Sequence, residues 1–270
     1  MIKLIAIDMD GTLLDPSHEI TPRVRASVIA AREQGIRIVL ATGRPYSGVK
    51  PYLHQLGLDQ GEHFCITSNG SVVQQAATGE IWVESTLGQD EFRTFEAMAR
   101  ELGVHFHAIS QGDMITTNRD ISPHTVKDAY LTHTPLRIRD LDQLSSDMRY
   151  QKLMFVDEPA VLDAAIARIP AGALDGYNYV KSADDYFEIL NPEAGKGPAL
   201  RLLAERLGVA PAQIMAIGDH ENDLSMFRYV GTPVAMGNAI DAVKSAAKYV
   251  TRSNAHDGVA HAIESYALKA

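Results

Sequence analysis

Acidic side chains follow two apolar segments of this 270-residue chain at short spacing. Asp8 and Asp10 come directly after the first segment, and Asp219 and Asp223 follow a later one. Carboxylates gathered at one place repel one another and are costly to remove from water, so such a group favours a bound cation. Oxygen ligands without histidine or cysteine are typical of a hard ion such as Mg²⁺. A magnesium ion beside an anionic ligand is in turn typical of phosphoryl chemistry.

The elements that would position these carboxylates alternate between strand and helix. Residues 3–7, 36–41 and 64–67 are short apolar runs, as expected of strands buried on both faces, and helices are predicted between them. The alternation returns near the end of the chain, where residues 214–217 form another apolar run. The pattern predicts an α/β fold with a doubly wound parallel sheet and helices on both of its faces.

Ligands bind to such a sheet beyond the carboxyl ends of its strands. Thr42, Gly43 and Arg44 follow the second predicted strand, so hydroxyl and guanidinium groups are expected at the same edge as the carboxylates. Turn formation or helix capping explains one or two such residues, but not four converging carboxylates. Asn69 and Gly70, which follow the third strand, are interpreted as a turn.

The middle of the chain has a different pattern, in which paired short strands and helices predict a mixed α+β module. The predicted organisation is a core of residues 1–84 and 191–270 with an inserted cap of residues 85–190. This cap is expected to act as a lid that excludes water from the reaction. Its predicted hinges lie near residues 84–86 and 190–195.

Composition excludes several classes of protein. With 25 basic and 34 acidic side chains the net charge is −9, which disfavours a general nucleic-acid binder. The one cysteine, Cys65, excludes a disulfide framework and is expected to be buried. No apolar run reaches the ~18–20 residues of a membrane span, and the first run is too short for a signal peptide. We therefore expect a soluble, cytoplasmic protein with no membrane partner.

Histidines do not occur at spacings typical of metal ligands. His105 and His107 share one face of a predicted strand, and His124 and His133 lie further along the chain, without an HxxxH pair or a cysteine partner. Packing or surface roles are predicted for them.

The segment Asp8-Met9-Asp10-Gly11-Thr12-Leu13 resembles the first signature motif of the haloacid dehalogenase superfamily of phosphotransferases. Thr42-Gly43-Arg44 resembles the second motif, Lys196 the third, and residues 218–223 the fourth. The large insert between the second and third motifs is similar to that of the Cof-type (subfamily IIB) hydrolases, and the whole sequence resembles the sugar-phosphate phosphatases of that group. The resemblance implies a Rossmann-like core with an inserted cap, and a Mg²⁺-dependent phosphatase that acts on small phosphorylated metabolites.

The resemblance also implies a role for each motif residue. Asp8 would be the nucleophile that forms an aspartyl phosphate. Asp10 would act first as general acid and then as general base. The implied metal ligands are Asp8, the backbone carbonyl of Asp10, Asp219 and Asp223. The implied phosphate-binding residues are Thr42, Gly43, Arg44, Lys196 and Asn222.

Other classes of enzyme lack a required motif in this sequence. A Rossmann dehydrogenase needs GxGxxG after the first strand, and a P-loop kinase needs an upstream glycine and a Ser or Thr after Lys196. A phosphorylated receiver domain lacks the second aspartate. The alternatives that stay open are a phosphatase for a nucleotide or cofactor phosphate, a phosphomutase, and a non-catalytic phosphometabolite-binding protein. A monomer or a homodimer is expected.

Overall fold

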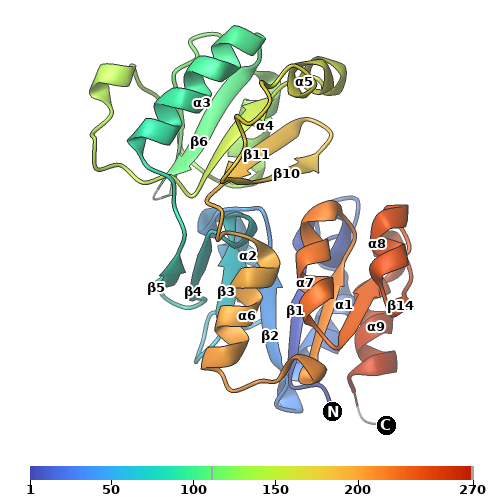
Figure 1. Ribbon diagram of the computed structural model, residues 1–270. Helices are drawn as coiled ribbons and strands as arrows, with labels where there is room; N and C mark the ends of the chain where they lie inside the picture. Colours follow the sequence, from blue (N-terminus) through green and yellow to red (C-terminus); the bar gives the residue numbers. More distant parts are fainter. Residues whose placement is uncertain (111, 269–270) are drawn as a thin grey trace. The chain divides into compact units, whose positions relative to one another are not determined.

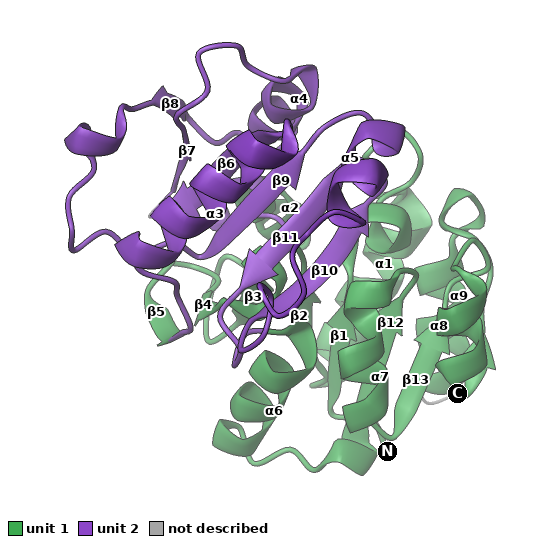
Figure 2. Cartoon of the chain, turned by 45° about the horizontal axis from the view of Figure 1, so that its top comes forward, with its two compact units in different colours: residues 1–43, 49–83, 195–270 green, residues 44–48, 84–194 purple. Residues whose placement is uncertain are grey.

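The computed structural model describes residues 1–110 and 112–268. The chain divides into two compact units (Figure 2). Unit 1 comprises Met1–Gly43, Val49–Val83 and Gly195–Ala270, and unit 2 comprises Arg44–Gly48 and Glu84–Ala194. The core and cap boundaries drawn from the sequence stay a prediction. The division seen in the structure differs from them most clearly in placing the short segment Arg44–Gly48 with unit 2.

Unit 1 is built around an eight-stranded sheet with the strand order β14-β13-β12-β1-β2-β3-β4-β5. The strands are β1 (Leu4–Ile7), β2 (Arg37–Ala41), β3 (Phe64–Thr67), β4 (Val72–Gln75), β5 (Ile81–Glu84), β12 (Ile214–Gly218), β13 (Thr232–Ala235) and β14 (Tyr249–Val250). The pairs from β14 to β3 are parallel, whereas β3 and β4 are antiparallel. The predicted α/β fold with a parallel-sheet core is thereby confirmed.

Helices cover both faces of this sheet (Figure 1). Their bounds are α1 (Pro22–Glu33), α2 (Tyr46–Gln55), α6 (Lys196–Arg206), α7 (Leu224–Tyr229), α8 (Asp241–Ala246) and α9 (Gly258–Tyr266). Helix α7 packs against α6 and α8, whereas α1 packs against α9. Thr21 caps α1 by accepting a hydrogen bond from the backbone N–H of Val24, and Pro22 is the first helical residue, as the sequence predicts.

Strand β1 lies between β12 and β2 and is parallel to both. All four of its residues are buried, which explains why it is a continuous apolar run. Because parallel strands end at the same edge, the residues after β1, β2 and β12 meet there. Asp8, Thr42 and Asp219 are those residues.

Unit 2 is an α+β module whose six-stranded sheet has the order β10-β11-β9-β6-β7-β8. Its strands are β6 (His105–Ser110), β7 (Asp113–Thr116), β8 (Leu136–Ile138), β9 (Lys152–Val156), β10 (Asn178–Ala183) and β11 (Tyr186–Leu190). Helices α3 (Gln89–Leu102) and α5 (Pro159–Ile166) pack with this sheet around an aromatic core that includes Phe92, Phe106 and Phe155.

The structure contains elements that the sequence did not predict. Helix α4 (Pro123–Leu131) begins at a Ser-Pro cap, but Thr125 is its one buried residue, so no apolar stripe marks it. Strands β8 and β14 have three and two residues, too short for a period of two to be visible. No helix in the described part of the chain is long and apolar enough to cross a membrane.

A close backbone contact joins the turn after β3 to the start of α6. Gly70 has a φ of +90°, and a Cβ added there would lie 2.2 Å from the carbonyl carbon and oxygen of Gly195. Backbone atoms cannot move aside as a flexible side chain can. Only glycine therefore fits at position 70 without displacing the N-terminus of α6, which carries Lys196.

We expect Gly70→Ala to lower the free energy of unfolding of unit 1 by about 2–5 kcal/mol, from the left-handed backbone and the steric overlap together. Gly35→Ala is the matched control, because Gly35 has a φ of +80° and no atom within 4 Å of an added Cβ. Gly35→Ala should lower the free energy of unfolding by about 1–2 kcal/mol, because only the left-handed backbone disfavours it. Fluorescence of the single tryptophan, Trp82, reports denaturant unfolding of unit 1. Equal losses in the two variants would contradict the steric argument.

Candidate active site

The chain leaves β1 through a tight turn that presents Asp8. Residues Met9–Leu13 form a turn with non-helical backbone angles at Asp10 and Gly11, in which the N–H of Leu13 donates to the carbonyl of Asp8 at 3.1 Å. Gly11 has a φ of +79°, and a Cβ there would lie 2.4 Å from Oδ2 of Asp219. Glycine at this position therefore lets the turn approach the Asp219 carboxylate directly.

A fully buried ammonium group connects the acidic residues of two strand ends. Lys196 Nζ donates to Oδ1 of Asp8 at 2.6 Å and to Oδ1 of Asp223 at 2.7 Å, and its side chain is 0% exposed. Burial alone would lower the pKa of Lys196, but the two carboxylates, Asp223 foremost, raise it above its usual value. Lys196 is therefore protonated at neutral pH, and its charge is shared between both carboxylates.

The remaining carboxylate oxygens hold the loop that follows β12. Oδ2 of Asp223 accepts hydrogen bonds from the backbone N–H of Asp219 at 2.9 Å and of His220 at 3.2 Å. The hydroxyl of Thr12 donates to Oδ1 of Asp219 at 2.9 Å. The carboxylates of Asp8, Asp219 and Asp223 are thus oriented by hydrogen bonds and ion pairs.

These three carboxylates form a cluster that could hold a metal ion. Asp8, Asp219 and Asp223 each offer one oxygen, and these oxygens lie within 4.8 Å of one another. Burial and the neighbouring charge of Asp223 raise the pKa of Asp8 well above its ordinary value, and the same two causes raise the pKa of Asp219 to about 6. One ammonium does not compensate two buried carboxylates and a partly buried one, so the donor set fits a hard divalent cation.

Asp10 has a different environment from Asp8. Its carboxylate is 47% exposed, and Oδ1 lies 3.5 Å from Nδ1 of His18. It is not part of the three-carboxylate cluster. The implied metal ligand was the backbone carbonyl of Asp10, and this assignment stays a prediction. An exposed carboxylate can exchange protons with water, as a general acid and base must.

Thr42 and Asn222 meet through a residue that the sequence analysis interpreted as a turn former. The carbonyl of Thr42 accepts from the N–H of Asn69 at 2.9 Å, and the Nδ2 amide of Asn222 donates to Oδ1 of Asn69 at 2.9 Å. A Cβ on Gly43 would lie 3.0 Å from the Asn69 amide. Asn69 forms the turn between β3 and β4 and also links these two predicted phosphate ligands, a role that the turn signal did not reveal.

Arg44 belongs to unit 2, whereas the other motif residues belong to unit 1. It is buried, and its guanidinium donates to the carbonyl of Leu131 at the end of α4 at 3.4 Å. The packing around this arginine is set by α4, which the sequence did not predict. Its contact with phosphate stays a prediction.

A cysteine and a histidine, residue types that could have suggested other chemistry, are both packed in the interior. Cys65 is buried in β3, which confirms the prediction, and burial raises the pKa of its thiol to about 12. His107 is also buried, and its Nδ1 lies 3.0 Å from the hydroxyl of Thr125. Its predicted packing role is confirmed.

Comparisons with known proteins agree with this arrangement. Residues 5–263 match the family of haloacid dehalogenase-like hydrolases. A Bacillus subtilis protein named "Putative phosphatase YxeH" is 44% identical over 268 residues, with 99% of each chain covered. The 5-amino-6-(5-phospho-D-ribitylamino)uracil phosphatase YcsE of the same organism is 31% identical, with 99% of this chain and 96% of that protein covered. A haloacid dehalogenase-like hydrolase structure from Bacteroides thetaiotaomicron has a TM-score of 0.86 at 32% identity, covering 98% of this chain and 99% of that chain.

The contacts of Asp223 predict a large effect of its neutralisation on stability. In Asp223→Asn, the amide cannot offer oxygen atoms both to Lys196 and to the two backbone N–H groups, so a buried charge loses one partner. We expect the free energy of unfolding to fall by about 3–5 kcal/mol. Denaturant unfolding followed by Trp82 fluorescence measures it.

Glu205→Gln is the control for this substitution. Glu205 forms an exposed ion pair with Arg201 at 3.2 Å, and the loss of such a pair should cost no more than about 1 kcal/mol. If Asp223→Asn were as stable as Glu205→Gln, the buried ion network would not be the constraint that the structure indicates.

Proposed function

Because the chain belongs to the haloacid dehalogenase-like hydrolase family and is an enzyme of the phosphatase type, we propose that it hydrolyses small phosphomonoesters, chiefly sugar phosphates. The reaction proceeds through an aspartyl phosphate on Asp8. The observation that carries this proposal is the contact of the buried Lys196 ammonium with Asp8. It places a carboxylate and a positive charge at one point, and the positive charge favours the ionised form that attack on a phosphate dianion requires.

In the first half of the reaction, an Asp8 oxygen forms a bond to phosphorus while the bond from phosphorus to the alcohol oxygen breaks. The departing oxygen takes a proton from Asp10, and the alcohol leaves. Asp8 needs no base, because a carboxylate is already a nucleophile when ionised. Lys196 favours the ionised form of Asp8, in opposition to burial and the charge of Asp223, which raise its pKa.

In the second half, Asp10 has lost its proton and can accept one from water. The resulting hydroxide forms a bond to phosphorus, the bond to the Asp8 oxygen breaks, and inorganic phosphate leaves. Both carboxylates then return to their starting protonation states. The half-exposed position of Asp10 supports this role, because the group must take and return a proton in each cycle.

Phosphate oxygens are held, in this proposal, by Thr42, Gly43, Arg44, Lys196 and Asn222. Mg²⁺ would be held by Asp8, Asp219 and Asp223 together with the backbone carbonyl of Asp10. When bound, the ion neutralises phosphate charge and so lowers the barrier to attack by an anion. The three-carboxylate cluster supports this choice of ion, because it contains oxygen ligands and no histidine or cysteine.

The named substrate of one relative favours a second candidate. YcsE is named as a phosphatase for a phosphorylated ribitylamino compound, and this chain is 31% identical to it. A cofactor-precursor phosphate of that kind is therefore the alternative to a sugar phosphate. We propose residues 85–190 as the cap that discriminates between them, and the cytoplasm as the site of the reaction.

Phosphorylated metabolites ranked by kcat/KM in saturating Mg²⁺ test the substrate class. Hexose and pentose phosphates should exceed nucleotides and phosphorylated ribitylamino compounds by tenfold or more, which corresponds to about 1.4 kcal/mol of transition-state discrimination. A phosphorylated ribitylamino compound at the head of the ranking would overturn the sugar-phosphate proposal and leave the phosphatase mechanism intact.

Substitution of the nucleophile gives the sharpest test of the mechanism. Asp8→Asn should lower the release of phosphate from an aryl phosphate by more than about 10⁴-fold, and acid quenching with ³²P-labelled substrate should label the wild type but not the variant. Asp10→Asn should slow turnover by about 10²–10⁴-fold and leave substrate affinity nearly unchanged. Asp241→Asn, an exposed carboxylate of unit 1, is the control and should behave as wild type. Label retained in Asp8→Asn would exclude this nucleophile.

The proposed ion is tested by its removal and return. Hydrolysis should stop in EDTA and recover in excess Mg²⁺. Mg²⁺ at 100 times its Kd should stabilise the protein by about 2.7 kcal/mol, visible as a raised Tm. Asp219→Asn should abolish this shift because it removes a charged ligand from the cluster. Full turnover in EDTA would contradict the metal site.

A further inference from the structure

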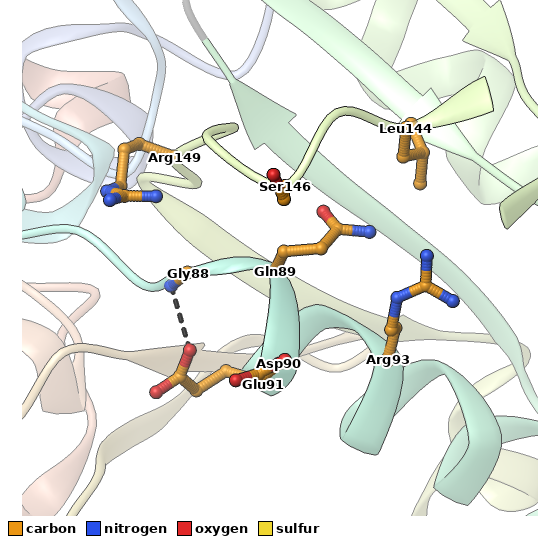
Figure 3. A pocket seen from close by; sticks show the side chains of 8 residues that line it. All are labelled: Gly88, Gln89, Asp90, Glu91, Arg93, Leu144, Ser146 and Arg149. Carbon is orange, nitrogen blue, oxygen red and sulfur yellow. Dashed lines mark hydrogen bonds between the residues drawn. The ribbon is translucent and has the colours of Figure 1, made fainter. Parts of the chain in front are cut away.

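A cavity of about 560 Å³ lies at the N-terminal end of α3 in unit 2, outside the site described above (Figure 3). Two acidic and two basic residues are among those that line it, namely Asp90, Glu91, Arg93 and Arg149. Their formal charges balance, so the wall indicates no class of ligand. More specific contacts surround the turn that carries Asp10 in unit 1.

The position of the Asp10 carboxylate depends on the backbone of its turn, because the side chain is 47% exposed. Asp10 has φ −75° and ψ 121°, and Gly11 has φ +79° and ψ −4°, which are the angles of the two central residues of a type II turn. Glycine also accepts the type I form, in which the peptide between these residues is turned over. Gly11 alone therefore does not hold Asp10 in one arrangement.

An asparagine from a distant part of the chain holds this turn. The Nδ2 amide of Asn238 donates to the carbonyl of Gly11 at 2.8 Å. Its Oδ1 accepts from the backbone N–H of Asn254 at 2.9 Å. A backbone N–H can only donate and a carbonyl can only accept, so the amide fits these two partners in one orientation. Asn238 therefore restrains the peptide that follows Gly11.

Asn254 holds the other end of the same turn. Its Nδ2 amide donates to the carbonyl of Leu14 at 2.9 Å. Because its backbone N–H also bonds to Asn238, the two asparagines form one connected pair. This pair fixes the turn at two carbonyls, those of Gly11 and Leu14.

The loop that carries Asn238 is itself bonded to the end of β12. The N–H of Met236 donates to the carbonyl of Gly218 at 3.0 Å, and the N–H of Ile240 donates to the carbonyl of Asp219 at 3.1 Å. Asn238 lies between these two contacts in the sequence. It therefore relates the Asp10 turn to Asp219, which belongs to the three-carboxylate cluster.

We propose that Asn238, supported by Asn254, is a positioning residue that keeps the Asp10 carboxyl directed at the departing alcohol oxygen. This inference rests on the proposed function, in which Asp10 gives a proton to that oxygen. Asn238 itself touches no substrate and transfers no proton. Its loss leaves the nucleophile in place, because Asp8 is held by Lys196. The expected defect is therefore confined to leaving groups that need a proton.

The test compares two esters that differ in this need. One is the sugar phosphate or other alkyl phosphate with the highest kcat/KM, whose alkoxide must be protonated as it leaves. The other is dinitrophenyl phosphate, whose phenolate leaves without a proton. Because kcat/KM covers the steps up to the departure of this group, the later role of Asp10 as a base does not enter.

In Asn238→Ala, kcat/KM should fall about 10- to 100-fold for the alkyl phosphate and less than about twofold for dinitrophenyl phosphate. Asp10→Asn is the reference, since it removes the acid itself and should show the same selectivity with a larger loss. Asn254→Ala should show it with a smaller loss, because residue 254 keeps the backbone N–H that orients Asn238.

Gln213→Ala is the matched control. The Gln213 amide also bonds to the backbone, accepting from the N–H of Ala210 at 3.3 Å, but it precedes β12 and so lies at the opposite edge of the sheet. Both kcat/KM values should stay unchanged in this variant. Equal losses for the two esters in Asn238→Ala, or no loss with either, would exclude the positioning role and leave the phosphatase mechanism intact. A wild type that hydrolyses neither ester would overturn the proposed function and this inference with it.

Discussion

The site depends on an excess of buried negative charge around one ammonium group. Asp8 and Asp223 each contact Lys196, and Asp219 lies in the same cluster. Three carboxylates and one lysine leave a net negative charge in a region where water is largely excluded, which is why the pKa values of Asp8 and Asp219 rise. A cation relieves this repulsion, and an anionic substrate then becomes acceptable beside Asp8. The same charge imbalance thus supports both the proposed metal ion and the proposed phosphate chemistry.

The parallel sheet makes such a concentration of charge possible. Asp8 and Lys196 are separated by 188 positions in the sequence, yet their side chains are 2.6 Å apart. β1 and β12 are paired in register, so the residues that follow them are adjacent without any long loop. Gly11 and Gly70 then allow the turns to approach Asp219 and Gly195 more closely than a side chain would permit. The strands therefore place these residues at one edge of the sheet, and the two glycines permit the close contacts between the turns.

The sequence predicted the residues whose positions follow from strand ends, and it did less well where tertiary packing decides. Asp8, Asp219 and Asp223 could be grouped because each follows a buried run at a sheet edge. Asn69 was recognised only as a turn former, because nothing in a local signal shows that its amide bonds to Asn222. Helix α4 lacks an apolar stripe and was missed, so the surroundings of Arg44 could not be foreseen. A local sequence pattern indicates which face of a helix or strand is buried, but it does not indicate which residue of another element will contact that face.

Asp8 and Asp10 are two residues apart and have the same side chain, but their environments differ. Asp8 is buried against an ammonium, which favours an ionised group whose lone pairs are available for attack. Asp10 is half-exposed beside His18, where a proton can be lost to water and regained. A continued strand would place side chains two residues apart on the same face, but the turn after Asp8 bends the chain so that the Asp10 side chain reaches solvent. One turn therefore gives the proposed nucleophile and the proposed acid and base different surroundings. This separation requires a chain that leaves the sheet immediately after Asp8, which a longer first strand would prevent.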